Sequence, residues 1–315
     1  MGVILLGGIS DKIHRNPLHT SAGIAYTGLN EVIETRTRVF IANGKPTGSI
    51  NGEPVEYSTS NRSPFHVLDK YSGTIFENLN IKQANNSISF MSTNKGILSG
   101  SSDAGAAAIG SDIEVLSGGN IPKSELEADL RAISESAGRS FYGGLSITSV
   151  QDGKISTERI LDEQAFRNYV ILGCRFNVTR NPSDRIHENI VKSPDYGKRI
   201  ESTQNKAILL KRKAEESDIE GIFDMAHEDT LEYHRLIESV GVYVITPKMR
   251  RLMDHVDKLR KQTWASYIVT GGSNVFVVVQ AKNMRDVIQS IEGMYDGLSL
   301  LKVAGRSHPV SVRLG

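Results

Sequence analysis

The stretch Gly96-Ile97-Leu98-Ser99-Gly100-Ser101-Ser102-Asp103-Ala104-Gly105 runs directly into three alanines at positions 106–108. Glycines and serines followed by strong helix formers predict a loop that feeds a helix. The N–H groups at a helix start lack intrahelical acceptors and carry the positive end of the helix dipole, so they attract phosphate. The stretch therefore predicts a phosphate-binding loop, and an ordinary tight turn with an N-cap serine is the alternative.

This loop lacks the common nucleotide-binding fingerprints. A Walker A loop ends in Gly-Lys-Ser/Thr, which is missing here, and no GxGxxG follows a predicted strand. The hydroxyls of Ser101 and Ser102 can contact a phosphate or a Mg²⁺ ion. The chemistry of the loop is thus predicted from its small residues and the helix start alone.

Short strands and helices surround the loop without strict alternation. Alternating or continuous apolar runs predict strands at 3–6, 21–26, 39–42, 87–91, 145–150, 169–178, 267–269, 275–279 and 300–304. Capping patterns predict helices after Ser124, Ser217-Asp218 and Thr246-Pro247, and a further helix covers 286–294. The first of these helices is expected to run up to Arg139 and Gly143-Gly144. This order favours an α+β fold over a doubly wound sheet.

Composition excludes several classes of protein. The 315 residues carry 37 Lys+Arg against 36 Asp+Glu, so the net charge of +1 gives no bulk electrostatic footprint for nucleic acid. No apolar run approaches the ~18 residues of a membrane span, and residues 1–9 predict a buried strand, not a signal peptide. We therefore expect a cytoplasmic protein without membrane attachment. Cys174, the single cysteine, excludes a disulfide framework and predicts a buried thiol.

Four further polar segments could carry chemistry. Glu135 and Arg139 lie four residues apart, which suits either a clamp for a hydroxy acid or a plain helical ion pair. Arg180 follows a predicted strand and can bind a carboxylate or phosphate, with simple solvation as the alternative. The turn Thr270-Gly271-Gly272-Ser273-Asn274 separates two apolar strands, which predicts a hairpin, and its adjacent glycines suit either close backbone approach to a ligand or a plain hairpin turn. The segment 227–234 lacks the HExxH spacing of a zinc helix and predicts a solvated helix face.

Together these segments resemble the GHMP kinase superfamily, and within it the diphosphomevalonate decarboxylase-like branch. Ser99–Gly105 is similar to the phosphate loop of the superfamily. The other similar segments, in chain order, are Leu5-Leu6-Gly7-Gly8, Asn16-Pro17-Leu18-His19-Thr20-Ser21, Ser136-Ala137-Gly138-Arg139-Ser140 and Thr270–Asn274. The resemblance spans the whole chain. Family members carry a further strand before Gly2, so we expect the given chain to be truncated at its start.

The resemblance implies a two-lobed α+β fold with the ligands in a cleft between the lobes. We expect an N-terminal lobe with the phosphate loop over residues 1–165 and a C-terminal lobe over residues 166–315 that completes the substrate pocket. It also implies ATP and Mg²⁺ as cofactors, and a homodimer. Ser99, Gly100, Ser101, Ser102, Asp103 and Gly105 would cradle the ATP phosphates, and Ser101 or Ser102 would lie near Mg²⁺.

Departures from the decarboxylase pattern change the expected reaction. The catalytic aspartate of the decarboxylases is Thr270 here, which cannot serve as a base. The lysine near the substrate's diphosphate is Leu5, the following lysine is Ile9, and a glycine has become Glu135. A pocket that loses cations and gains a carboxylate disfavours a diphosphate. The substrate is therefore predicted to be mevalonate itself.

The resemblance thus implies ATP-dependent phosphorylation of the 3-hydroxyl of (R)-mevalonate without decarboxylation, in a modified archaeal mevalonate route to isoprenoids. Arg139 and Arg180 would bind the carboxylate, and Leu5 and Ser136 would also contact the substrate. Glu135 would orient the 3-hydroxyl, with Ser101 and Thr270 beside it. The alternatives are an ATP-dependent decarboxylase of a phosphorylated mevalonate, in which Lys12 or Arg15 replaces the lost lysine, and a non-catalytic ligand-binding paralogue.

Overall fold

The computed structural model describes residues 1–179, 181–272 and 274–309 in two compact units. Unit 1 contains Met1–Ile9, Pro17–Val32 and Gly143–Gly305; unit 2 contains Ser10–Asn16, Ile33–Tyr142 and the segment from Arg306 onward. These units are interleaved in the sequence and do not follow the expected division at residue 165. The physical reason is strand pairing, because the first strand of the chain joins the same sheet as the strands at 145–161.

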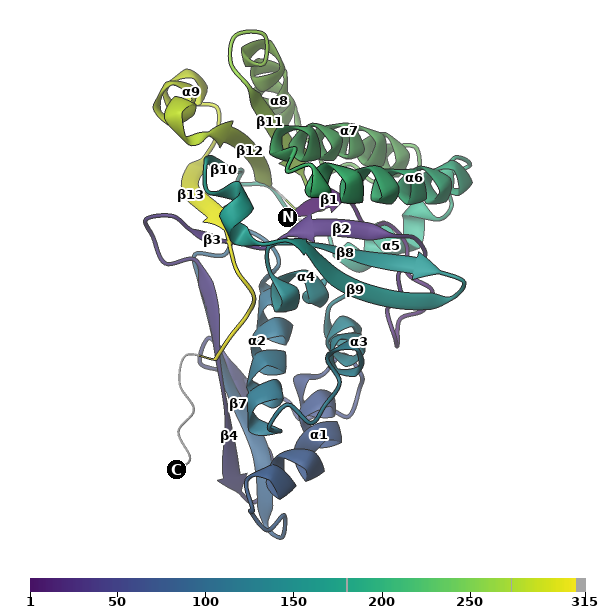
Figure 1. Cartoon of the computed structure of the whole chain (residues 1–315), viewed down its shortest axis with the longest axis vertical. Helices are drawn as coiled ribbons and strands as arrows, with labels where there is room; N and C mark the ends of the chain where they lie inside the picture. Colours follow the sequence, from purple (N-terminus) through teal and green to yellow (C-terminus); the bar gives the residue numbers. More distant parts are fainter. Residues whose placement is uncertain (180, 273, 310–315) are drawn as a thin grey trace. The chain divides into compact units, whose positions relative to one another are not determined.

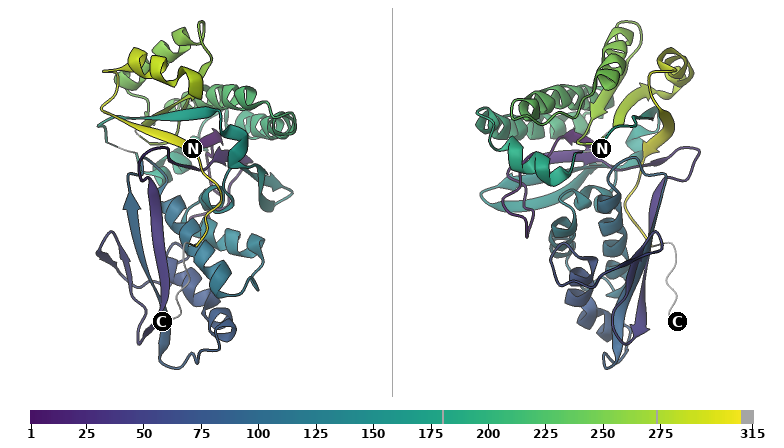
Figure 2. Two further views of the ribbon diagram at one scale, coloured as in Figure 1. Left: turned by 60° about the vertical axis from the view of Figure 1, so that its left-hand side comes forward. Right: turned by 180° about the vertical axis from the view of Figure 1, so that it is seen from behind.

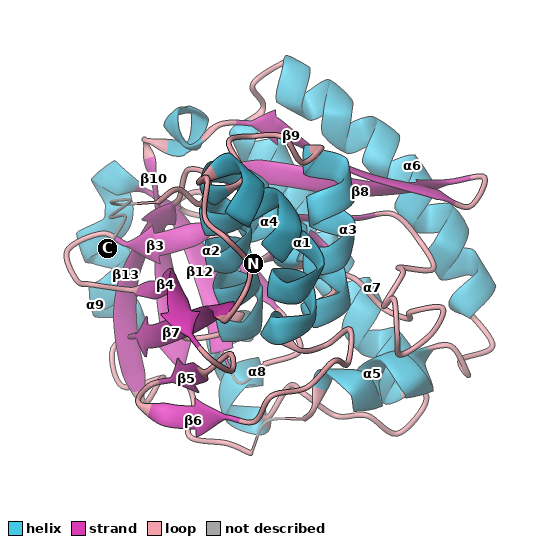
Figure 3. Cartoon of the chain, turned by 90° about the horizontal axis from the view of Figure 1, so that it is seen from below, coloured by secondary structure: helices cyan, strands magenta, loops and turns pink. Residues whose placement is uncertain are grey.

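Unit 2 is a sheet covered by helices (Figure 1). The sheet has the order β4-β7-β5-β6, with β4 Glu34–Asn43, β7 Asn86–Lys95, β5 Gly48–Ile50 and β6 Glu53–Val55. The view in Figure 3 shows this sheet beside the helices of the unit, which are α1 Pro64–Asn78, α2 Ser101–Leu116, α3 Lys123–Ile133 and α4 Ala137–Tyr142. Phe65, Phe90, Ile113, Leu130 and Phe141 are central members of its core.

The prediction of one helix from Ser124 to Arg139 is wrong in two respects. The N-cap of α3 is Pro122, two residues before the predicted cap Ser124, and no side chain caps the helix. Glu127 therefore does not complete a capping box, and its carboxylate pairs instead with the buried Arg131 at 2.7 Å. The chain then turns extended at Ser134, with φ −148° and ψ 122°, so α3 and α4 are separate helices.

Unit 1 contains two sheets. The first has the order β1-β2-β8-β9, formed by β1 Gly2–Ile4, β2 Ser21–Ile24, β8 Leu145–Gln151 and β9 Lys154–Leu161. The second has the order β11-β12-β10-β13-β3, formed by β11 Ala265–Val269, β12 Asn274–Gln280, β10 Tyr169–Arg175, β13 Gly297–Val303 and β3 Tyr26–Gly28. The hairpin predicted around the Thr270–Asn274 turn is confirmed, because β11 and β12 pair antiparallel.

The helices of unit 1 are α5 Ser183–Ile190, α6 Tyr196–Glu215, α7 Ile219–Glu238, α8 Pro247–Leu259 and α9 Met284–Ile291. Two short 3₁₀ turns cover Glu163–Phe166 and Ala281–Asn283. The predicted caps of α7 and α8 are confirmed: the Asp218 carboxylate accepts from the N–H of Gly221, and the Thr246 hydroxyl accepts from that of Met249. In Figure 2, α6 and α7 run side by side.

The segment 227–234 is not a solvated face. Asp229 and Thr230 are fully buried, and Tyr233 and His234 are nearly so, because α7 packs against β1, β11 and α6. Cys174 is buried as predicted, and burial raises the pKa of its thiol to about 12. None of the helices in the described ranges combines the length and the apolar character that crossing a bilayer requires.

Candidate active site

The start of α2 has the geometry of an anion site. Gly100 is the N-cap residue with φ +78°, and no side chain caps the helix. The first bond within the helix runs from the N–H of Ala104 to the carbonyl of Gly100 at 2.9 Å. The N–H groups of Ser101, Ser102 and Asp103 therefore have no acceptor within the helix, and they lie at the positive end of its dipole.

Asp103 in the first turn of α2 collects a network of donors. Its carboxylate accepts hydrogen bonds from the Ser134 hydroxyl at 2.5 Å and from the Ser136 hydroxyl at 2.8 and 2.9 Å. The Arg139 guanidinium lies 3.9 Å away. Asp103 thus links the start of α2 to the break between α3 and α4. Three residues predicted to bind ligands, Asp103, Ser136 and Arg139, are brought together within unit 2.

The break between α3 and α4 also positions Glu135. Because the chain leaves the helix at Ser134, Glu135 and Arg139 are not a helical ion pair, and the prediction that both lie on one helix end is wrong. The partner of Glu135 is Arg15, whose Nε and Nη2 donate to Oε2 of the carboxylate at 3.0 and 2.8 Å. The sequence analysis missed this pair.

Arg15 changes the charge balance inferred from the sequence. Its side chain is fully buried, its backbone has φ +53°, and its guanidinium neutralises the carboxylate that the sequence analysis treated as a gained negative charge. A paired carboxylate keeps its acceptor role but contributes much less net repulsion toward an anionic ligand. No local pattern predicts the pair, since 120 residues separate its partners.

The predicted residues of unit 1 lie in different surroundings. Leu5 is 5% exposed and packs in the hydrophobic core of its unit. Thr270 directly follows β11 and is half-buried. Arg180, and Ser273 of the turn, fall outside the described residues. The predicted roles of all these residues stay predictions.

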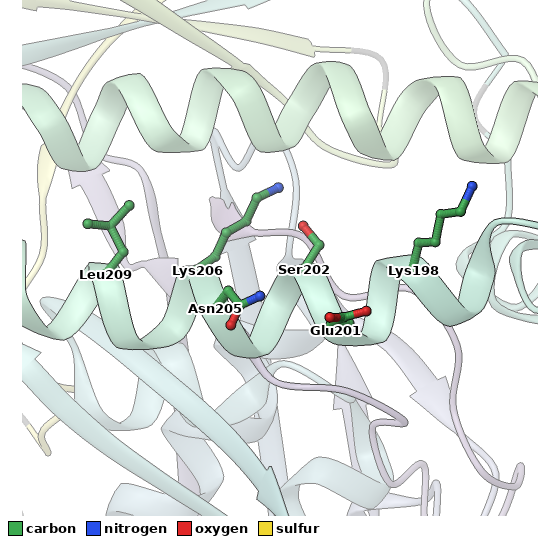
Figure 4. A pocket seen from close by; sticks show the side chains of 6 residues that line it. All are labelled: Lys198, Glu201, Ser202, Asn205, Lys206 and Leu209. Carbon is green, nitrogen blue, oxygen red and sulfur yellow. The ribbon is translucent and has the colours of Figure 1, made fainter.

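A pocket on the surface of α6 involves none of the predicted residues. It has a volume of about 400 Å³ and is lined by Lys198, Glu201, Ser202, Asn205, Lys206 and Leu209 (Figure 4). Lys206 is already bound to Asp229 at 2.8 Å and to Glu232 at 2.5 Å, and Lys198 is bound to Asp195. Both lysines of this pocket are therefore already paired within the protein.

Comparison with known proteins shows the class of protein to which the chain belongs. The family model of the diphosphomevalonate decarboxylase-like N-terminal domain matches residues 1–158. Mevalonate diphosphate decarboxylase from Staphylococcus aureus, 16% identical, shares the fold with a TM-score of 0.78 over 98% of this chain and 94% of that chain. The predicted α+β fold of the GHMP kinase superfamily is thereby confirmed.

Relatives with higher sequence identity over nearly the whole chain show the family within that class. A model of the mevalonate-3-kinase C-terminal domain matches residues 181–285. Mevalonate-3-kinase of Picrophilus torridus is 43% identical over 311 residues, 99% of this chain and 95% of that protein. Mevalonate 3-kinase of Thermoplasma acidophilum is 45% identical over 97% of this chain and 93% of that protein. The crystal structure of the Thermoplasma enzyme with mevalonate 3-phosphate and ADP has a TM-score of 0.89, with 43% identity over 97% of this chain and 94% of that chain. The chain belongs to the mevalonate 3-kinase family.

Proposed function

We propose that the chain transfers the γ-phosphoryl group of ATP to the 3-hydroxyl of (R)-mevalonate, giving ADP and 3-phosphomevalonate without decarboxylation. The bond from the γ-phosphorus to the ADP oxygen breaks, the 3-oxygen bonds to phosphorus, and the hydroxyl proton is released. The family assignment supports this reaction, and the solved Thermoplasma relative holds mevalonate 3-phosphate and ADP.

The observation that carries the proposal is the Asp103 network of unit 2. Its hydrogen bonds to Ser134 and Ser136 hold the start of α2 against the segment that carries Glu135. A donor site for phosphate and a group that can orient an alcohol are therefore fixed to each other. Phosphoryl transfer depends mainly on such positioning and on charge neutralisation, so this arrangement suits the reaction.

The phosphate loop would bind ATP through Ser99, Gly100, Ser101, Ser102, Asp103 and Gly105. The uncapped N–H groups of α2 support contact with its phosphates. Mg²⁺ prefers few protein ligands alongside substrate phosphates and water, and among the described residues the hydroxyls of Ser101 and Ser102 make no hydrogen bond with protein. These hydroxyls fit such an ion, which would neutralise charge on the transferring phosphoryl group.

Glu135 would accept a hydrogen bond from the 3-hydroxyl and orient its oxygen toward phosphorus. Arg139 would bind the mevalonate carboxylate together with Arg180, and its buried Nε, which has no hydrogen-bond partner in the described part of the chain, supports that role. Ser136 would contact the same substrate. In unit 1, Thr270 would shape the pocket, and Leu5 would present an apolar side chain where the decarboxylases carry a lysine.

The decarboxylase alternative needs a cation in place of the lost lysine. Arg15 was a candidate, but its guanidinium is paired with Glu135, so it does not favour that alternative. A single experiment tests the proposed reaction: incubation with ATP, Mg²⁺ and mevalonate, followed by ³¹P and ¹³C NMR of the product. Phosphorus coupling at C3 is expected, and coupling at C5 would overturn the proposal.

We also infer a homodimer that acts in the cytoplasm of an archaeal cell, in isoprenoid synthesis and thus lipid metabolism. The family relationship supports these assignments. Light scattering after size-exclusion chromatography tests the oligomeric state: a mass near twice the 34.5 kDa of one chain is expected, and a mass of one chain at working concentration would contradict it.

A further inference from the structure

The segment Leu5–Gly8 leaves the sheet of unit 1 directly after β1. The last pair of β1 with β2 joins Ile4 to Ala22, so the backbone beyond it has no strand partner until the bridge between Ile9 and Pro17. A buried backbone N–H or carbonyl without a partner is strongly unfavourable. Side chains from other elements must therefore form hydrogen bonds with the backbone of Leu5–Gly8, and these bonds fix the position of the segment.

An ion pair between α6 and α7 holds Leu5 by both of its polar backbone groups. The Leu5 N–H donates to Oδ2 of Asp229 at 2.7 Å, and the Leu5 carbonyl accepts from Nη2 of Arg199 at 2.8 Å. Arg199 and Asp229 also bind each other at 2.6 and 2.9 Å. Both side chains are almost completely buried, so the pair fixes the residue that replaces the decarboxylase lysine.

Two tyrosines hold the next carbonyls. The Tyr233 hydroxyl of α7 donates to the carbonyl of Leu6 at 3.2 Å, and the Tyr196 hydroxyl of α6 donates to the carbonyl of Gly7 at 2.6 Å. Tyr196 and Tyr233 are 8% and 3% exposed. Each carbonyl is therefore held by a rigid aromatic side chain whose ring is packed in the core of unit 1.

Two histidines accept the glycine N–H groups. Gly7 donates to Nε2 of His19 and Gly8 donates to Nδ1 of His187, both at 3.1 Å. Because Nδ1 of His19 faces the carbonyl of Thr20 at 2.8 Å, it must carry the proton and Nε2 must be bare. His19 is therefore a neutral imidazole in a single tautomer, fixed by its two neighbours.

The packing leaves no room for a side chain at either glycine of the segment. A Cβ atom on Gly7 would lie 2.5 Å from Cδ1 of Ile190, and one on Gly8, where φ is +91°, would lie 2.2 Å from the Tyr196 hydroxyl. The backbone thus rests directly on the side chains that bond to it. Many buried side chains, distant in the sequence, hold the backbone of this segment in one conformation, and such support is typical of functional positions.

We infer that His19, His187, Tyr196, Arg199, Asp229 and Tyr233 form a positioning frame for Leu5–Gly8 and that this frame sets the affinity for mevalonate. The inference rests on the proposed function, in which Leu5 contacts the substrate. The frame residues touch backbone and not substrate, so they are positioning residues. Loosening the frame shifts Leu5 and its neighbours and weakens mevalonate binding, whereas binding of ATP is unchanged.

The test removes single hydroxyls, which leaves each ring in place. Tyr196→Phe and Tyr233→Phe each leave one carbonyl of the segment without its donor, and Tyr267→Phe is the matched control. Tyr267 is 1% exposed in unit 1 and its hydroxyl donates to Asp257 at 3.2 Å, away from the segment. The measurements are KM for mevalonate, KM for ATP and, by calorimetry, Kd for mevalonate without nucleotide.

We expect the frame variants to raise KM and Kd for mevalonate by roughly 5- to 10-fold, the scale of one buried hydrogen bond, with KM for ATP unchanged. The control should leave all three constants at wild-type values. Unchanged mevalonate constants in folded Tyr196→Phe and Tyr233→Phe proteins, or equal changes in all three variants, would overturn the frame. If the wild-type protein phosphorylates mevalonate in that case, only the frame fails; if it does not, the proposed function itself fails.

Discussion

The loop before α2 and the Leu5–Gly8 segment are both glycine-containing stretches without a strand partner, and their backbones are held in different ways. The loop enters a helix whose first N–H groups have no side-chain cap, so those groups stay available to a ligand. The Leu5–Gly8 backbone is bound by buried side chains from α5, α6 and α7. One stretch keeps its backbone donors for substrate, and the other uses nearly all of its backbone groups to fix its own position.

This difference predicts different responses to mutation. Changes at Gly100 should affect activity with little change in stability, because no side chain caps the helix that begins there. Changes in the frame should affect stability as well, because each frame residue is buried and bonded.

The largest effect is expected for Arg199→Met. Removal of the guanidinium leaves the carboxylate of Asp229 fully buried with Lys206 as its remaining cation, and breaking a buried pair in this way costs about 3–5 kcal/mol. The free energy of unfolding, from urea denaturation, measures it. A loss below about 1 kcal/mol, the scale of an exposed ion pair, would show that the pair does not hold unit 1 together.

The variant Gly100→Val tests whether the loop before α2 is needed for activity. A valine would be strained at φ +78°, and its Cβ would lie 3.3 Å from Oδ2 of Asp103, so both the backbone at the start of α2 and the Asp103 carboxylate are disturbed. We expect kcat to fall by about 100-fold or more, the effect of misplacing a reacting group by about 1 Å. Gly119→Val, with φ +74° after the other end of α2, is the control. Equal activity of the two variants would remove the loop from the active site.

Glu135→Gln tests the group that is proposed to orient the 3-hydroxyl. An amide has nearly the same shape but is a weaker acceptor and loses its ion pair with Arg15. The expected fall in kcat is about 100-fold, as for other groups positioned at a reacting proton, with KM for ATP unchanged. Wild-type kcat in this variant would reduce Glu135 to a structural partner of Arg15.

The smallest effect concerns pH, and the two regions should respond with opposite signs. Burial lowers the pKa of His19 to about 4, so the unfolded chain binds its proton first and unit 1 loses stability as pH falls from about 6.5 to 4. Burial raises the pKa of Asp112 on α2, which accepts from the N–H of Val39, to about 6. Protonation of this buried carboxyl in the folded state therefore stabilises unit 2 as pH falls from about 6 to 4.

Amide hydrogen exchange at pH 6.5 and pH 4.5 distinguishes these trends. After correction for the intrinsic pH dependence of exchange, protection near Gly7 should fall at the lower pH while protection in α2 and β4 is kept or rises. Asp112→Asn should remove the second trend and raise stability at neutral pH by roughly 1 kcal/mol, a value discounted for partial exposure of the carboxyl. The same sign in both regions would contradict the assigned protonation states.

Local patterns predicted much of the fold correctly. Asp218 and Thr246 cap their helices as expected, since a cap depends on residues within one turn. The break at Ser134 was not predicted, because the helical spacing continues across it in the sequence. Residues 229–234 looked solvated because their burial depends on α6 and β1, which are distant in the sequence.

In the candidate site, too, features set by neighbouring residues were predicted, and features set by residues distant in the sequence were not. The residues at 99–105 correctly predicted a loop that feeds a helix, but the helix begins at Ser101, before the alanines, so only Ser99 and Gly100 of these residues lie outside it. The Arg15–Glu135 pair and the frame were missed, since their partners lie 120 and up to 227 residues apart. A polar side chain that bonds to backbone across such a distance leaves no spacing pattern in the sequence.

Parallel measurement of ADP and CO₂, with mevalonate and with diphosphomevalonate as substrates, tests whether the protein phosphorylates mevalonate without loss of CO₂. We expect stoichiometric ADP and 3-phosphomevalonate from mevalonate, no CO₂ from either substrate, and little ADP from diphosphomevalonate. Efficient CO₂ release from diphosphomevalonate, at a rate matching ADP formation, would contradict this expectation and make the protein a decarboxylase.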